Sequence, residues 1–268
     1  MLSIAEDLSL ALDCGEVFKR CIGGDPDPWQ LRVLEWCASG DPAGANLARK
    51  LFLLTSRQAG KTSVVSVATI IQSLWGCPGG TTILAAPSMR QSSSVMRVIM
   101  KAYRRLTAGR DDAQDLEAES KCSVTLANGS RILCVPGSND GNTLRGEVAD
   151  TILVDEIFFT SAELVQSLRP MISTKGGRGK LILLGTPRYA SGFAYDLWRS
   201  GDPSWQREKI TAAQCPRIDP QWLENERREI GDAAKSEYDC EFVDPGAAIF
   251  GSEILEAALS DDINVIRW

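Results

Sequence analysis

The sequence has 268 residues, of which 44% are hydrophobic and 24% are charged. This composition predicts one large globular domain, or one domain with a small appendage, and excludes disordered, collagen-like and fully coiled-coil chains. The absence of histidine excludes Ser-His-Asp and Cys-His catalysis and imidazole zinc sites. The net charge of −6 excludes a basic field over the whole surface, so a nucleic acid would have to bind a local basic patch.

The eight cysteines never approach a C-x-x-C spacing, which predicts reduced, packed thiols in a cytosolic protein. The amino-terminal stretch has no basic leader before its apolar residues, so no signal peptide is expected. No run of 18 apolar residues occurs, and no membrane span is expected.

The first half of the chain predicts helices and then repeated strand-helix units. Apolar spacing predicts a helix over 2–22 and, after a turn at 23–28, a second helix that ends at Ala38. The short apolar run 51–54 is typical of a strand buried on both faces, and it precedes a turn and a long apolar helix over 62–75. The pattern repeats with a strand at 81–86, a cap at Ser88 and a helix over 91–106.

The second half continues the alternation. The acidic stretch 111–119 predicts an exposed loop, and Asn128-Gly129 between strands at 123–126 and 131–135 predicts a hairpin with a tight primed turn. Further strands are expected at 151–154 and 180–184, with a helix over 161–172 between them.

The order of these elements predicts an α/β fold with a mainly parallel sheet and helices on both faces. Two helical stretches, 221–229 and 232–242, follow without a strand between them. We therefore expect an α/β core with amino-terminal helices over 1–215 and a small helical lid or linker subdomain over 216–268.

The strongest functional pattern lies between the strand at 51–54 and the helix at 62–75. Its residues are Thr55, Ser56, Arg57, Gln58, Ala59, Gly60, Lys61 and Thr62. In a phosphate-binding loop, Gly60 lets the backbone amides turn toward the phosphates, Lys61 reaches the outer phosphates and the Thr62 hydroxyl meets Mg²⁺. Thr55 stands where the first Gly of G-x-x-x-x-G-K-[ST] is usual, so the match is incomplete, but the strand-loop-helix setting supports it.

A pair of acids ends the strand at 151–154. Asp155 at this position can hold Mg²⁺, and Glu156 can orient or deprotonate an attacking water. Two solvated acids at a strand end are the alternative, which a phosphate loop earlier in the chain disfavours.

Together with three further motifs, these stretches resemble the ATPase domain of the large terminase subunit, the DNA-packaging motor of tailed bacteriophages. The five motifs are Pro28-Trp29-Gln30, Ser56 to Thr62, Ala86 to Gln91, Leu153 to Glu156, and Leu184-Gly185-Thr186-Pro187. Their order and spacing over 28–187 are more specific than any one motif. The loop of that family commonly lacks the first Gly, so Thr55 fits the resemblance, which implies an ASCE-type P-loop fold.

The resemblance also implies roles for further residues. Gln30 would hydrogen-bond the adenine edge with Trp29 nearby, and Thr186 would lie near the γ-phosphate and report hydrolysis to the DNA-gripping surface. Arg145 is the candidate arginine finger acting in trans in a neighbouring subunit, and Arg57 competes as a finger or phosphate sensor in cis. Ordinary packing, turn or surface roles are the alternatives.

The function that follows is Mg²⁺-dependent ATP hydrolysis coupled to translocation of double-stranded DNA into a procapsid. By the resemblance, the partners are the portal protein, the small terminase subunit and further copies in a homo-oligomeric, pentameric ring in the cytoplasm of the infected bacterial host. A helicase-like DNA-dependent ATPase and a docking module that binds ATP without hydrolysis are the alternatives. A single sheet leaves no room for a second helicase domain, and the intact loop and acid pair favour hydrolysis.

Four cations on the helix over 91–106 form the candidate nucleic-acid contact. They are Arg97, Lys101, Arg104 and Arg105. Like charges at this spacing repel one another, and DNA phosphates would relieve the repulsion. A solvated helix face is the alternative.

Full large terminases continue into a metal-dependent nuclease of the RNase H-like type, built on a cluster of acids. Asp261-Asp262 is too little for such a site, so no nuclease activity is expected. The sequence is either a cut-out motor domain, which we favour, or a motor whose nuclease lies elsewhere.

Overall fold

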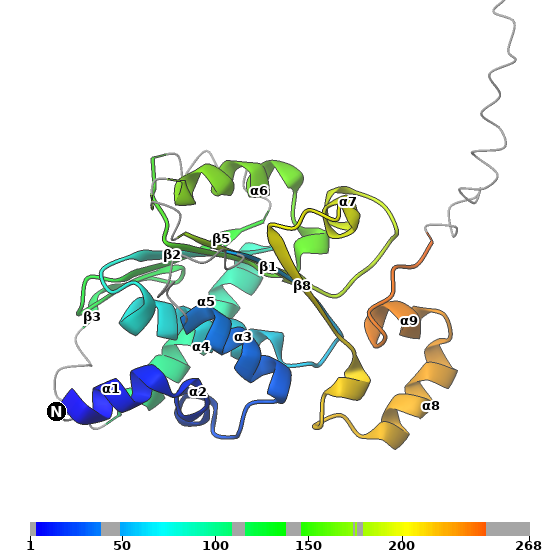
Figure 1. The fold of residues 1–268 in the computed structure, drawn as a ribbon, viewed down its shortest axis with the longest axis horizontal. Coiled ribbons are helices and arrows are strands. Elements are labelled where there is room, and N and C mark those ends of the chain that lie inside the picture. Colours follow the sequence, from blue (N-terminus) through cyan, green and yellow to red (C-terminus); the bar gives the residue numbers. More distant parts are fainter. Residues whose placement is uncertain are drawn as a thin grey trace, which may run out of the picture.

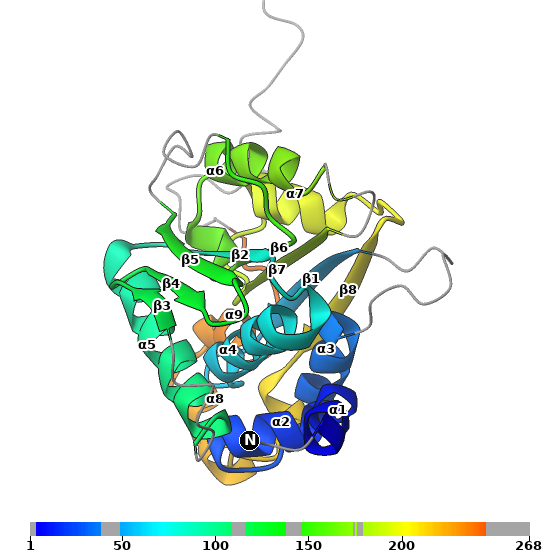
Figure 2. The ribbon, with the colours of Figure 1, turned by 90° about the vertical axis from the view of Figure 1, so that its left-hand side faces the viewer.

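A central sheet of eight strands organises the computed structural model, which describes residues 4–38, 49–108, 116–137, 146–173, 175 and 179–244. The strand order is β3-β4-β5-β2-β6-β7-β1-β8. The strands are β1 Lys50–Thr55, β2 Thr81–Ala86, β3 Leu116–Glu119, β4 Ser123–Leu126, β5 Arg131–Pro136, β6 Thr151–Val154, β7 Lys180–Gly185 and β8 Trp205–Ile210. In this spatial order, each neighbouring pair in the part β5-β2-β6-β7-β1-β8 is parallel. Strands β3, β4 and β5 pair antiparallel at one edge of the sheet (Figure 2).

Helices cover both faces of this sheet. They are α1 Ile4–Leu12, α2 Cys14–Ile22, α3 Pro28–Ala38, α4 Lys61–Ile71, α5 Met89–Leu106, α6 Ala162–Leu168, α7 Phe193–Arg199, α8 Pro220–Ile230 and α9 Ala233–Glu237. Helices α1 to α5 lie on one side of the sheet, α6 and α7 on the other, and α8 and α9 beyond the end of β8 (Figure 1). This arrangement is the mainly parallel α/β architecture that the alternating pattern predicts.

The buried strands show why the sequence forms two cores. Along β1, Leu51 and Leu53 point to the core that α2 to α5 cover, whereas Phe52 and Leu54 point to the core beneath α6 and α7. Because side chains alternate between the two faces, a strand covered on both sides needs apolar residues at every position. A separate small cluster joins α8 and α9 and includes Leu223. The boundary at 215/216 stays a prediction.

The single helix expected over 2–22 is wrong, because the chain breaks at Asp13. The Asp13 carboxylate accepts a hydrogen bond from the Glu16 backbone amide at 2.9 Å and caps the start of α2. An aspartate that satisfies a free amide of the first turn starts a new helix more readily than it continues an old one.

Two expectations around the hairpin also differ from the structure. The loop expected over 111–119 includes the edge strand β3, which pairs with the free side of β4, while 111–115 lie outside the described residues. The hairpin forms, but its turn is not of the primed type: Gly129 has a φ of 79° and Asn128 is not left-handed. The Asn128 side chain instead donates to the Ser73 carbonyl at 2.9 Å.

Helix α7 and strand β8 were not expected from the sequence. Strand β8 carries four consecutive polar or charged residues between Trp205 and Ile210, as a sheet edge beside β1 allows. The second lid helix ends at Glu237 instead of 242, and Cys240 adopts a φ of 53° beyond it. Of the helices in the described part of the chain, none is long and apolar enough to cross a membrane.

Candidate active site

The candidate site lies at the carboxyl ends of the parallel strands. Strand β1 pairs with β7 so that Leu54 faces Gly185, and β6 pairs with β7 so that Val154 faces Leu183. The loops that follow these strands therefore leave the sheet at nearly the same level. In open α/β sheets this edge is where ligands bind.

The phosphate loop wraps tightly from β1 into α4. Gly60 has a φ of 92° and stands at the amino-terminal cap of α4, and Lys61 is the first helical residue. A side chain at Gly60 would place its Cβ only 2.6 Å from Gln30 Nε2 and 2.8 Å from Arg217 Nη2. The position therefore needs glycine for both its backbone conformation and its surroundings. No side chain caps the start of α4, so the amides of its first turn are available to an anion.

Lys61 joins the three loops of the site. Its Nζ donates to Thr186 Oγ1 at 2.7 Å and to the Ser56 carbonyl at 3.5 Å. The same Nζ lies 3.5 Å from Glu156 Oε1, and its side chain is only 11% exposed. The structure thus brings together Lys61, Thr186 and Glu156, three residues that the sequence predicts for the site.

Asp155 is the buried member of the acid pair. Burial, and after it the neighbouring Glu156, raises its pKa to about 6, although Lys61 and the Glu156 amide act to lower it. The Glu156 amide donates to Asp155 Oδ1 at 3.0 Å. A carboxylate whose charge is this poorly stabilised is a group that a bound cation would stabilise.

Glu156 adopts a backbone conformation that is unusual for a residue with a side chain. Its φ is 51°, in the left-handed region. Opposite it, Gly185 leaves just enough space, since a Cβ there would lie 3.1 Å from the Ile157 amide nitrogen. Backbone strain of this kind is common at functional sites.

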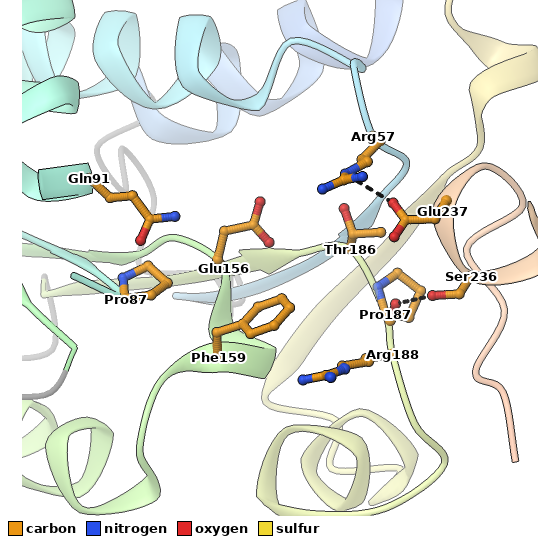
Figure 3. Close-up of a pocket in the computed structure, with 10 residues that line it drawn as sticks. All are labelled: Arg57, Pro87, Gln91, Glu156, Phe159, Thr186, Pro187, Arg188, Ser236 and Glu237. Atoms are coloured by element: carbon orange, nitrogen blue, oxygen red, sulfur yellow. Dashed lines mark hydrogen bonds and ion pairs between the residues drawn. The ribbon is translucent and has the colours of Figure 1, made fainter. Parts of the chain in front are cut away.

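A cavity of about 330 Å³ opens beside these residues (Figure 3). It is lined by Arg57, Pro87, Gln91, Glu156, Phe159, Thr186, Pro187, Arg188, Ser236 and Glu237. Glu156 projects into its middle, and Arg57 faces Glu237 across one wall. Residues from the loops after β1, β2, β6 and β7 therefore line one space together with residues of α9.

The sequence does not predict the contacts that α9 makes with the phosphate loop and with the loop after β7. Arg57 Nε lies 3.1 Å from Glu237 Oε2, and the Arg57 amide donates to the Glu237 carbonyl at 2.8 Å. Ser236 Oγ donates to the Pro187 carbonyl at 2.5 Å. Nothing local in the sequence marks these residues, because both partners come from distant segments.

A second support holds the phosphate loop from the other side. Arg217 Nη2 donates to Asp27 Oδ2 at 2.8 Å and to the Ala59 carbonyl at 2.7 Å. Asp27 is 5% exposed, and a buried acid of this kind needs its partner. Its place directly before the Pro28-Trp29-Gln30 motif is the one indication that the sequence offers.

Trp29 and Gln30 lie under the phosphate loop. Trp29 is 3% exposed and packs in the core, so its ring does not face the cavity. Gln30 accepts from the Asp27 amide at 2.9 Å, and its Nε2 lies 3.5 Å from the Gly60 carbonyl. Gln30 is thus placed as a support of the loop, and its adenine contact, like the predicted role of Trp29 beside the nucleotide, stays a prediction.

The predicted basic stripe on α5 is divided among different partners. Arg105 is exposed and donates to the Ile22 carbonyl at 3.0 Å, which caps the end of α2, and its DNA contact stays a prediction. Arg104 pairs with Glu119 at 2.9 Å. Arg97 and Lys101 are exposed, and their DNA contact stays a prediction. Arg145 lies outside the described residues.

The residues fit a nucleotide-bound Mg²⁺. This cation takes one or two protein oxygens and fills its other positions with phosphates and water. The exposed Thr62 hydroxyl at the start of α4 and the Asp155 carboxylate would supply those oxygens. No group of three acids or cysteines that could hold a metal alone occurs in the described residues.

Three comparisons place the chain among known proteins. Residues 52–257 match the family model of the terminase large subunit, T4likevirus-type, amino-terminal part. The chain is similar to the large terminase ATPase domain of Thermus phage P74-26, with 18% identity, a TM-score of 0.66 and coverage of 84% of this chain and 97% of that one. No curated protein matches the sequence.

Longer terminases match over about half their length. The large terminase of the thermophilic bacteriophage D6E, in complex with ADP, has 16% identity and a TM-score of 0.66 over 81% of this chain and 54% of that one. The HK97 bacteriophage large terminase has 16% identity and a TM-score of 0.60 over 86% and 50%. At these identities the structures show a shared P-loop ASCE fold. The chain therefore belongs to the terminase large subunit family, the DNA-packaging proteins of tailed phages, and it corresponds to their ATPase domain.

Proposed function

We propose that this chain hydrolyses ATP with Mg²⁺ and converts the hydrolysis into movement of double-stranded DNA into a procapsid. The observation that carries the proposal is the convergence of Lys61, Thr186 and Glu156 beside one cavity at the carboxyl edge of the sheet. The D6E terminase has been determined with ADP and with ATP-gamma-S, which supports nucleotide as the ligand.

The phosphate loop supplies the binding step. The amides of the first turn of α4 and the Lys61 ammonium would hold the phosphates, and Thr62 and Asp155 would hold Mg²⁺, which when bound would neutralise charge on the phosphate oxygens. When Lys61 turns toward phosphate it leaves Glu156, and the Glu156 carboxylate becomes available as a base.

Glu156 then orients a water molecule and accepts its proton. The water oxygen forms a bond to the γ-phosphorus while the bond from that phosphorus to the bridging oxygen breaks, and ADP leaves with the electron pair. Charge on the equatorial oxygens needs an arginine. Arg57, which lines the cavity, is the candidate in cis, and Arg145 from a neighbouring subunit is the candidate in trans.

The wider assembly follows from the family. We propose that the chain works in a homo-oligomeric, pentameric ring on the portal protein, with the small terminase subunit delivering the DNA, in the cytoplasm of the infected bacterial host. Thr186 would report hydrolysis through the loop after β7, because it contacts Lys61 and precedes Pro187, which α9 contacts.

Phosphate release in the presence of ATP, Mg²⁺ and procapsids tests the proposal. We expect Glu156→Gln to retain nucleotide binding but lose at least about 100-fold in turnover, since general-base catalysis contributes on this scale. We expect Lys61→Ala to lose nucleotide binding. Lys19→Ala and Glu224→Gln, which alter exposed ion pairs on α2 and α8, are the matched controls. Unchanged turnover by Glu156→Gln would refute the assignment.

A further inference from the structure

The wall of the cavity nearest the lid contains a pair of opposite charges. Arg57 from the phosphate loop lies 3.1 Å from Glu237 of α9, with the arginine side chain 68% exposed and the glutamate side chain 32% exposed. The Arg57 amide also donates to the carbonyl of Glu237 at 2.8 Å. One lid residue therefore holds the same loop residue through both side chain and backbone.

The electrostatics of the cavity make this pair significant. A polyphosphate must enter a space that two carboxylates, those of Glu156 and Glu237, already line. Lys61 lies beside the first carboxylate and Arg57 beside the second. Without nucleotide, the cations that would bind phosphate are thus matched with acids of the protein itself. A phosphate group must replace these acids as their partner.

Helix α9 also contacts the loop after β7. Ser236, the residue before Glu237, donates to the Pro187 carbonyl at 2.5 Å. Pro187 follows Thr186, which accepts from Lys61 at 2.7 Å. Consecutive residues of α9 therefore contact the phosphate loop and the loop after β7, and these two loops meet at Lys61.

We propose that Glu237 is a positioning residue, whose carboxylate holds Arg57 until the γ-phosphate of ATP competes for the guanidinium. The proposal rests on the ATP binding proposed above and names the lid group that senses it. A γ-phosphate carries more negative charge than a carboxylate, so Arg57 exchanges partners when ATP binds. ADP lacks the competing group and leaves the pair intact. The side-chain tie between α9 and the loop thus exists only in the absence of ATP.

Nucleotide affinity of the Glu237→Gln variant tests this role. Glutamine keeps the size of the side chain, and the backbone hydrogen bond does not depend on it. Binding of ATP-gamma-S and of ADP is measured by calorimetry with Mg²⁺ for the wild type, Glu237→Gln, Arg57→Ala and the double variant. Glu224→Gln, which removes the same charge from an exposed ion pair of α8, is the matched control.

We expect Glu237→Gln to bind ATP-gamma-S about 3- to 5-fold more tightly, the range that a half-exposed ion pair supports, and ADP with a change below about 1.5-fold. In the Arg57→Ala background the substitution should have no effect, because the competition needs the guanidinium. Glu224→Gln should behave as the wild type.

Three results would overturn the inference while leaving ATP binding in place. They are unchanged affinity for ATP-gamma-S, equal tightening for ADP, and tightening that does not depend on the Glu237–Arg57 pair, as shown by the Arg57→Ala background or by Glu224→Gln. A wild-type chain that binds no nucleotide would instead remove the proposed function, and this inference with it.

Discussion

Glu156, the candidate base, has a left-handed backbone conformation that residues other than glycine rarely adopt. Its place after an apolar strand identifies it as a candidate base, but its left-handed φ of 51° follows from the packing around β6 and β7. Such a conformation costs a residue with a Cβ roughly 1 kcal/mol. Glycine adopts it without that cost.

The strain gives a test at the residue scale. Glu156→Gly and Glu156→Ala both remove the carboxylate, yet we expect the glycine variant to be more stable by about 1 kcal/mol, since only alanine keeps the strained Cβ. Thermal unfolding of the two variants measures the difference. At an ordinary helical position alanine is the more stable residue, so the usual order here would contradict the left-handed geometry.

Asp155 gives a second test, through the pH dependence of stability. Its native pKa is raised to about 6 by burial, above the roughly 3.9 of an unfolded aspartate. The native state therefore binds the proton more tightly, and this contribution to stability is present below about pH 4 and is lost as the pH rises through 6.

In metal-free buffer, Asp155→Asn should raise the unfolding free energy at pH 7.5 by on the order of 2 kcal/mol, because it removes a buried charge. The gain should shrink as the pH falls toward 4. Denaturant titrations at several pH values measure it, with the exposed Asp25→Asn as control. A gain that is independent of pH would contradict the raised pKa.

At the scale of elements, the phosphate loop depends on supports from two distant segments. Gln30 of α3 and Arg217 before α8 both lie close to Gly60, and Arg217 donates to the carbonyl of the preceding Ala59. Arg217 is itself fixed by the buried Asp27. The conformation of the loop is therefore set before nucleotide arrives, which reduces the ordering cost of binding.

We expect Gly60→Ala to destabilise the protein by about 2 kcal/mol or more, since the new Cβ meets both supports and the φ of 92° is strained for alanine. Nucleotide affinity should fall with it. Gly24→Ala is the matched control, because a Cβ there meets nothing within 4 Å. Calorimetric unfolding and nucleotide titration measure both effects, and equal stability of the two variants would contradict the crowding.

The sequence predicts those elements whose own residues carry a recognisable pattern. Strands β1, β2, β6 and β7 are visible because burial on both faces demands uninterrupted apolar runs. The phosphate loop and acid pair are visible because each is a short motif beside such a strand. Edge strands β3 and β8 carry polar residues and depend on a neighbour for pairing, so their own residues do not reveal them.

The supports of the site escape prediction for the same reason. The pairs Arg57 with Glu237 and Arg217 with Asp27 join segments that only the complete fold brings together. Arg105 shows the converse. Helical spacing places it in a basic stripe, whereas in the fold its guanidinium also donates to the last carbonyl of α2. Spacing along one helix cannot show what the next element presents.

At the scale of the whole molecule, the open question is which arginine completes the site. Subunits with Lys61→Ala keep Arg145 but cannot bind nucleotide, and subunits with Arg145→Ala have the reverse defect. If Arg145 acts in trans, a mixture of the two should regain at least about tenfold more turnover than either alone. Phosphate release from mixed assemblies measures this. If Arg57 acts in cis, Arg145→Ala alone should retain turnover and mixing should add nothing.

The sheet order has a consequence for how the protein is made. Strand β1 carries the phosphate loop, but both of its partners, β7 and β8, follow every other described strand along the chain. Until they emerge from the ribosome, β1 has two unpaired edges and the loop has no fixed frame. A nascent chain that ends before β7 would therefore expose an apolar strand to aggregation and gain no protection from ATP.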